Sequence, residues 1–178
     1  LGLYDFLEKI TQKFPDVLFE GCSGGGGRFD AGMMYYHPQI WCSDDTDAIE
    51  RLRIQYGTSF AYPVSTVGAH VSVCPNHQTG RSVPMEPRGI VAMSGTFGYE
   101  LDITEMSEED KNVVRKQIEE FKKYYDLIQQ GDYYRLSDDG TKSNYVAWQF
   151  VSADKTESLV TGAVLRTKPN SPFRYVYL

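Results

Sequence analysis

Cysteine and histidine are scarce in this sequence, which has only three of each among its 178 residues. Three cysteines cannot all pair within one chain, and the spacing of Cys22, Cys42 and Cys74 matches no zinc-binding pattern. We therefore expect neither a disulfide framework nor a metal site. Low cysteine usage also favours a reducing compartment, so the expected location is the cytoplasm.

Excess positive charge and long apolar runs are also missing. The formal net charge is −6 and no basic patch stands out, so nucleic acid is not an expected partner. Residues 55–80 carry no Asp, Glu, Lys or Arg, but this stretch is too rich in Ser, Thr, Gly and Pro to cross a membrane. No basic segment precedes an apolar one at the N-terminus, as it would in a signal peptide. Membrane association is therefore not expected.

Several well-known binding and catalytic motifs are absent too. A phosphate-binding P-loop would need a lysine where Gly27 stands. The Gly-x-Ser-x-Gly pattern of serine hydrolases is absent around Ser23. The acidic residues after Trp41 lack the central glycine of a twelve-residue calcium loop. These absences argue against a phosphate-binding loop, a serine-hydrolase site and a twelve-residue calcium loop.

Short apolar runs alternate with helical patterns over most of the sequence, as is typical of β/α units that build a parallel sheet. The expected helices span residues 3–14, about 46–60 and 107–131, the second capped by Asp45 or Thr46 and the third by Ser107. The expected strands span residues 17–20, 38–42, 69–73 and 90–93. The predicted fold class is therefore α/β.

The pattern changes after Leu136. Residues 145–151, 158–165 and 173–177 are strand-like runs joined by short turns, which predicts an antiparallel sheet. We expect a boundary at which residues 1–134 form the β/α portion and residues 135–178 start a β-sandwich. Because the chain starts with Leu and its last run has no partner after it, we expect it to be a segment of a longer protein.

Two polar clusters follow the first two expected strands, where β/α barrels place their chemistry. Four consecutive glycines, Gly24–Gly27, leave the backbone open to a ligand, although a flexible loop is the alternative interpretation. In the second cluster, helix capping explains Asp45 and Asp47. Asp44 lies beside Trp41, and an apolar wall favours a protonated carboxyl group. A glycosidase needs such an acid to protonate a departing oxygen.

These clusters resemble the α-galactosidases of glycoside hydrolase family 36. The resemblance is carried by Cys-Ser-Gly-Gly-Gly-Gly-Arg-Phe-Asp at 22–30 and by Trp-Cys-Ser-Asp-Asp-Thr-Asp at 41–47. Residues 70–72, 75–79 and 95–101 extend it, so it runs essentially end to end. It implies retaining hydrolysis of terminal α-galactosides, such as melibiose and raffinose-type sugars, without a metal or organic cofactor.

The resemblance also implies roles for single residues. Asp44 corresponds to the general acid/base of the family. The implied substrate-binding residues are Cys22, Gly24, Gly25 and Trp41. Arg28 and Asp30 are expected to brace the glycine loop. A lone histidine is more often structural than catalytic, and His70, on the third expected strand, is the best candidate for a supporting role.

The implied fold is the second half of a (β/α)8 TIM barrel, strands five to eight, followed by part of an antiparallel β-sandwich. The family's nucleophile is an aspartate in a Lys-Trp-Asp-type motif upstream of the glycine loop, and no such motif occurs here. We therefore expect the chain to be inactive alone. Its expected partners are a galactoside oligosaccharide and the remainder of the enzyme chain, with homo-oligomerisation of the intact enzyme. The alternatives are a non-catalytic carbohydrate-binding or scaffold piece, and galactosyl transfer as in raffinose-synthase relatives.

Overall fold

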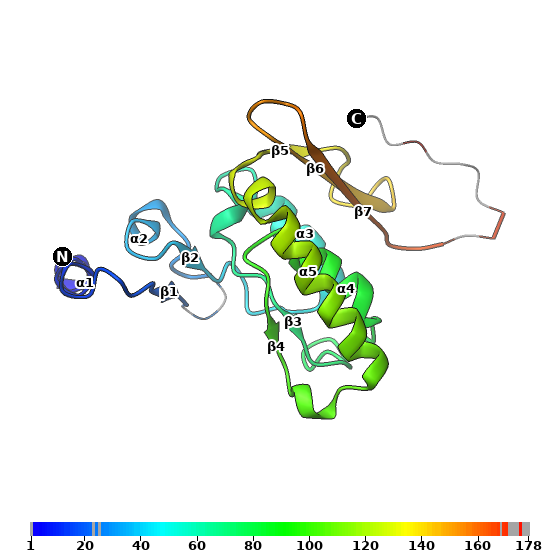
Figure 1. Cartoon of the computed structure of the whole chain (residues 1–178), viewed down its shortest axis with the longest axis horizontal. Helices are drawn as coiled ribbons and strands as arrows, with labels where there is room; N and C mark the ends of the chain where they lie inside the picture. Colours follow the sequence, from blue (N-terminus) through cyan, green and yellow to red (C-terminus); the bar gives the residue numbers. More distant parts are fainter. Residues whose placement is uncertain (1, 23, 25, 168, 171–174, 176–178) are drawn as a thin grey trace.

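A computed structural model describes residues 2–22, 24, 26–167, 169–170 and 175. Figure 1 shows α1, β1 and α2 at one end, helices α3, α4 and α5 in the middle, and the sheet of β5, β6 and β7 lying across these helices. The α-helices are α1 (Gly2–Lys13), α2 (Ala31–Met34), α3 (Ala48–Thr58), α4 (Met85–Ala92) and α5 (Glu108–Gln130), and the 3₁₀ turns are η1 (Val64–Thr66) and η2 (Ile103–Glu105). The strands are β1 (Glu20–Gly21), β2 (Gln39–Ile40), β3 (Val71–Ser72), β4 (Tyr99–Glu100), β5 (Asp132–Arg135), β6 (Tyr145–Val151) and β7 (Ser158–Val164).

The first four strands are short and parallel. β1 pairs with β2, where Gly21 lies opposite Ile40, and β3 pairs with β4, where Ser72 lies opposite Glu100. A parallel bridge between Ile40 and Val67 connects the two pairs. The carboxyl ends of these strands therefore face the same side of the molecule, as expected for β/α units.

The fourth strand is not where the sequence predicts it. Residues 90–93 belong to α4 and to the residue after it, and the fourth strand is β4. A four-residue apolar run fits a buried helix as well as a strand. Met85, Gly89 and Ala92 are buried at helical spacing, and a side chain at Gly89 would clash with Gln117 of α5. The close packing of two helices therefore decides the structure of this segment.

The long helices follow the expected capping rules, with one difference. Ser107 accepts the amide of Asp110 at 3.0 Å and begins α5, and Gly131 ends it. The cap of α3 is Asp47, whose carboxylate accepts the amides of Ile49 and Glu50, so capping by Asp47 is confirmed, whereas the prediction of Asp45 or Thr46 as the cap is wrong. Asp47 lies one step closer to the helix and offers an ionised acceptor to the positive end of the helix dipole.

The last three strands form the expected antiparallel sheet in the order β5–β6–β7. Of the predicted strand over 173–177, only Tyr175 lies within the described residues. β6 packs on the helices: Trp148 and Phe150 share one buried cluster with Leu52 of α3 and Leu127 of α5. The boundary after residue 134 remains a prediction.

Two chemical features concern the described residues as a whole. No helix within the described ranges is long and apolar enough to span a membrane. Cys22, Cys42 and Cys74 are all free thiols.

Candidate active site

A groove of about 370 Å³ lies at the carboxyl ends of the four parallel strands. Cys22 follows β1, Trp41 and Asp44 follow β2, and Glu100 ends β4. The full lining is Cys22, Trp41, Asp44, Thr46, Ser72, Val73, His77 and Glu100. Three residues that the sequence analysis selected from two separate clusters therefore meet at one groove.

Asp44 differs from the two carboxylates that follow it. Asp45 accepts the backbone amide of Asp47 at 2.9 Å, and Asp47 caps α3. Both are thus committed to the local backbone, while Asp44 is exposed and lines the groove. Within the described residues, the Asp44 side chain makes no hydrogen bond or ion pair, so its carboxyl group is available to a ligand.

Asp47 anchors the segment that carries Asp44. Only 1% of its surface is exposed, and it pairs with Arg81 and accepts a hydrogen bond from the Thr79 hydroxyl. Burial alone raises the pKa of Asp47. The hydrogen bonds from Thr79, from the α3 amides and from Arg81 outweigh that effect, and the pKa lies below its ordinary value. Asp47 is therefore a fixed negative charge at neutral pH.

Trp41 is held from two sides. Its ring meets the His70 ring edge-on, with centroids 4.5 Å apart, and a side chain at Gly98 would push against His70. The Arg51 guanidinium lies 5.9 Å from the Trp41 ring centroid. A tryptophan packed in this way presents a rigid apolar wall to the groove.

His70 also connects Trp41 to the far wall of the groove. Its Nδ1 atom lies 3.5 Å from the Oε2 atom of Glu100, the last residue of β4. This buried Nδ1 has no hydrogen-bond partner within the described residues. The His70 ring contacts Trp41 in the groove wall without lining the groove itself, and its supporting role remains a prediction.

Arg51 is a buried cation beneath the acidic loop. It donates to the carbonyl of Gly68 at 2.6 Å, to that of Ser43 at 3.3 Å, and to the Gln55 side chain at 3.1 Å. Burial lowers the pKa of Arg51, and the nearby Cys42 thiol opposes this shift. An arginine stays protonated despite such burial, so it ties the loop before Asp44 to the chain entering β3.

The glycine loop is open on one side and tightly packed on the other. Gly24 has a φ of +50°, and a Cβ added there would have no heavy atom within 4 Å, so its backbone is open to a ligand. Gly26 has φ of +83°, and a Cβ there would clash with the Cys42 carbonyl. Gly25 lies outside the described residues. Only glycine combines this backbone conformation with this close approach.

The two residues expected to brace the loop differ. Asp30 accepts the Met33 amide at 3.0 Å and caps α2, so it fixes the chain where the glycine loop ends. Arg28 is exposed, and its side chain has no hydrogen bond or ion pair within the described part of the chain. The bracing role of both residues remains a prediction, and only Asp30 makes a side-chain hydrogen bond within the described residues.

A family model described as Melibiase matches residues 1–131. This chain belongs to the Melibiase family. It is 57% identical over its full length to the bifunctional alpha-galactosidase/sucrose kinase AgaSK of Mediterraneibacter gnavus, and 53% identical to alpha-galactosidase AgaA of Geobacillus stearothermophilus. It covers 19% and 24% of these two relatives. The chain thus spans about a quarter or less of the length of these relatives.

Solved structures agree with this assignment. The galactosidase domain of AgaSK superimposes with a TM-score of 0.97 at 56% identity, over 99% of this chain and 24% of that one. A variant of AgaA from Geobacillus stearothermophilus in complex with raffinose gives a TM-score of 0.95 at 52% identity, again over 99% and 24%. This family member therefore has the mixed α/β fold of the corresponding part of GH36 α-galactosidases.

Sequence reasoning missed part of the groove in this family member. Glu100 was overlooked because its strand is only two residues long and carries no apolar run. Ser72 and His77 lie at the end of β3 and just beyond it, and the strand-end rule that selected Asp44 could have found them. Within the described residues, no group of three His, Cys, Asp or Glu side chains could hold a metal ion.

Proposed function

We propose that this chain carries the general acid/base and one wall of the sugar pocket of a retaining α-galactosidase. The observation that carries the proposal is that Asp44 alone of the three neighbouring aspartates faces the groove, beside Trp41 and Cys22. The names of the relatives support the substrate class, since they are α-galactosidases, and AgaA variants have been solved with raffinose and with stachyose.

We further propose that β1 to β4 are strands five to eight of a (β/α)8 barrel and that β5 to β7 begin a β-sandwich. Parallel pairing and a groove at the carboxyl strand ends support the barrel. Val17 and Leu18, just before β1, are 51% and 86% exposed. Parallel sheets are normally covered on both faces, so these side chains suit a site that the preceding barrel strands would cover.

In the proposed mechanism, Asp44 protonates the oxygen that leaves the anomeric carbon while a carboxylate from elsewhere in the enzyme attacks that carbon. Asp44 then accepts a proton from the water that releases galactose. The two carboxyl groups would lie about 5–5.5 Å apart, as retention requires. Proton transfer of this kind contributes about 10²–10⁴ to the rate. Trp41 would wall the pocket, Cys22 would contact the sugar, and Gly24 and Gly25 would let the sugar approach the backbone.

The test is Asp44→Asn in the intact enzyme that contains this segment. We expect binding of galactose to persist and raffinose hydrolysis to fall by about 10²–10⁴. Hydrolysis of para-nitrophenyl α-galactoside should fall less, because its leaving group needs little protonation. Asp45→Asn is the matched control, since asparagine can still accept the amide of Asp47. Unchanged melibiose or raffinose hydrolysis by the Asp44 variant would refute the assignment.

A second experiment addresses the isolated chain. With no upstream nucleophile motif, the purified 178-residue chain should not turn over an aryl α-galactoside. Glu100 is the other carboxylate that lines the groove, so a Glu100→Gln variant is measured in parallel. Turnover by the isolated chain that disappears in this variant would mean that Glu100 serves as the nucleophile and that the proposed division of the active site is wrong.

A further inference from the structure

The loop that follows β3 reaches back to the segment that carries Asp44. The Gln78 side chain donates from Nε2 to the Asp44 carbonyl at 2.6 Å and accepts the Thr46 amide on Oε1 at 2.9 Å. One primary amide therefore holds the backbone on both sides of residue 45. These contacts bridge more than thirty positions of sequence, because Gln78 and Asp44 are 34 residues apart.

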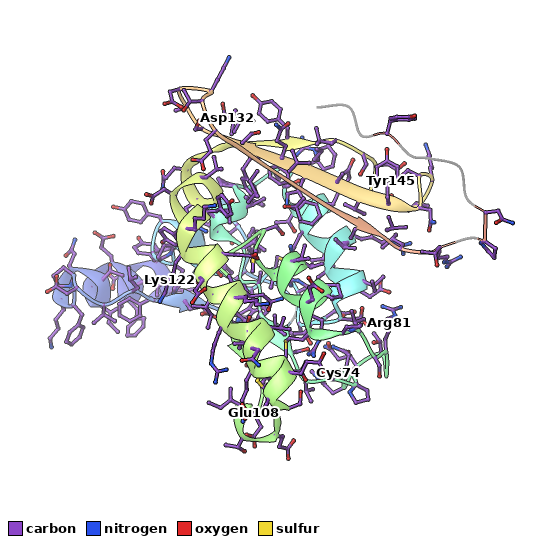
Figure 2. All side chains as sticks on the ribbon, turned by 45° about the vertical axis from the view of Figure 1, so that its right-hand side comes forward. Cys74, Arg81, Glu108, Lys122, Asp132 and Tyr145 are labelled. Atoms are coloured by element: carbon purple, nitrogen blue, oxygen red, sulfur yellow. The ribbon has the colours of Figure 1, made fainter. Side chains whose placement is uncertain are left out.

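Gln78 is itself held in place. The Asn76 side chain is buried, and its Oδ1 accepts the amides of Gln78 at 2.9 Å and Thr79 at 3.0 Å. The backbone amide of Asn76 donates to the Arg81 carbonyl at 2.9 Å, which closes the loop. Figure 2 shows Cys74 and Arg81, at the two ends of this loop, on the same side of the molecule. Arg81 and Thr79 then attach the loop to Asp47.

The Asp44 carboxyl group has no side-chain partner of its own within the described residues, as noted above. Its position must therefore be set by the backbone on which it sits. Proton transfer is sensitive to placement, and an error of about 1 Å can cost about 100-fold in rate. The Gln78 bridge is the side-chain contact that fixes the Asp44 carbonyl.

We propose that Gln78 is a positioning residue for the acid/base Asp44. Its amide holds the 44–46 backbone so that the carboxyl group stands in the groove at the height of the departing oxygen. This inference rests on the proposed function, and it assigns to the loop after β3 a direct effect on acid catalysis.

The test compares Gln78→Glu and Gln78→Ala in the intact enzyme. Glutamate keeps the acceptor for the Thr46 amide but replaces the donor to the Asp44 carbonyl with a negatively charged oxygen. Alanine removes both bonds. Gln78 is exposed, so both variants are expected to fold. Gln129→Glu is the matched control, because Gln129 also donates to a backbone carbonyl, that of Gly95, but does so away from the groove.

The readout is kcat/KM for raffinose and for para-nitrophenyl α-galactoside. A displaced acid should lower the raffinose value by about 10- to 100-fold and the aryl value by less than about threefold. The Gln129 variant should change neither. An equal fall on both substrates, or no fall on raffinose, overturns the positioning role. Asp44→Asn is measured in the same series: if it shows the leaving-group effect and the Gln78 variants do not, the inference fails while the proposed function stands.

Discussion

Asp47 offers a quantitative test of how the acidic loop is anchored. Asp47→Ala removes the helix cap, worth about 1 kcal/mol. It also removes the charged contacts to Thr79 and Arg81. Because the Arg81 side chain is 39% exposed, we take the low end of the range for a charged hydrogen bond, about 1.5 kcal/mol. The total is about 2.5 kcal/mol. Asp47→Asn keeps an acceptor for the cap and should cost only about 1.5 kcal/mol.

The assay is hydrogen exchange of peptides that cover the first turn of α3, measured in the intact enzyme. At about 1.4 kcal/mol per factor of ten, amides there should exchange about 60-fold faster in Asp47→Ala and about tenfold faster in Asp47→Asn. Peptides from β6 should exchange as in the wild type, since they lie outside the first turn of α3. Equal acceleration by the two substitutions would show that the cap contributes nothing, and no acceleration would refute the anchoring role altogether.

Three further predictions concern the acid stability of the fold, the glycine loop and the hydrophobic core. Folding lowers the pKa of Asp47, so its charge stabilises the fold above about pH 4, and this contribution is lost as the pH falls through the pKa of the folded state. The melting temperatures of the wild type and of Asp47→Asn should therefore converge in acid. Gly26→Ala forces a side chain against the Cys42 carbonyl at a left-handed φ of +83°, so the melting temperature should fall and KM for raffinose should rise; an unchanged melting temperature would contradict the close packing of this loop. Phe150→Ala opens a cavity in the core shared by β6 and the helices and should lower the free energy of unfolding by about 3–5 kcal/mol, measured by thermal unfolding. Val160→Ala, on the exposed side of β7, is the comparison and should be near-neutral. A near-neutral Phe150 variant would contradict that core.

Local signals in the sequence account for the correct predictions. Ser107 and Gly131 mark the ends of α5 because capping is decided by residues within one turn. Asp44 and Trp41 could be located because the carboxyl end of a parallel strand is also visible locally, as an apolar run followed by polar residues. The resemblance to α-galactosidases is what suggests chemical roles for these residues, and those roles remain predictions that neither spacing nor composition supplies.

Long-range contacts account for what was missed. Residues 90–93 lie in and just after α4, where Gly89 packs closely against Gln117 of α5, and this packing is not visible in either segment alone. Arg51 reads as an ordinary surface residue of an amphipathic helix, yet it is buried under Trp41. Gln78 belongs to a polar loop whose importance appears only when its partner, 34 positions earlier, is known.

The core that unites the helices with the last sheet has a practical consequence for anyone who trims this protein. The predicted boundary after residue 134 looks like a convenient place to stop, but it would strip Trp148 and Phe150 from their contacts with Leu52 and Leu127. A polypeptide ending there would expose hydrophobic helix faces to water and would tend to aggregate. Expression limits should therefore keep β5 to β7 together with α3 and α5.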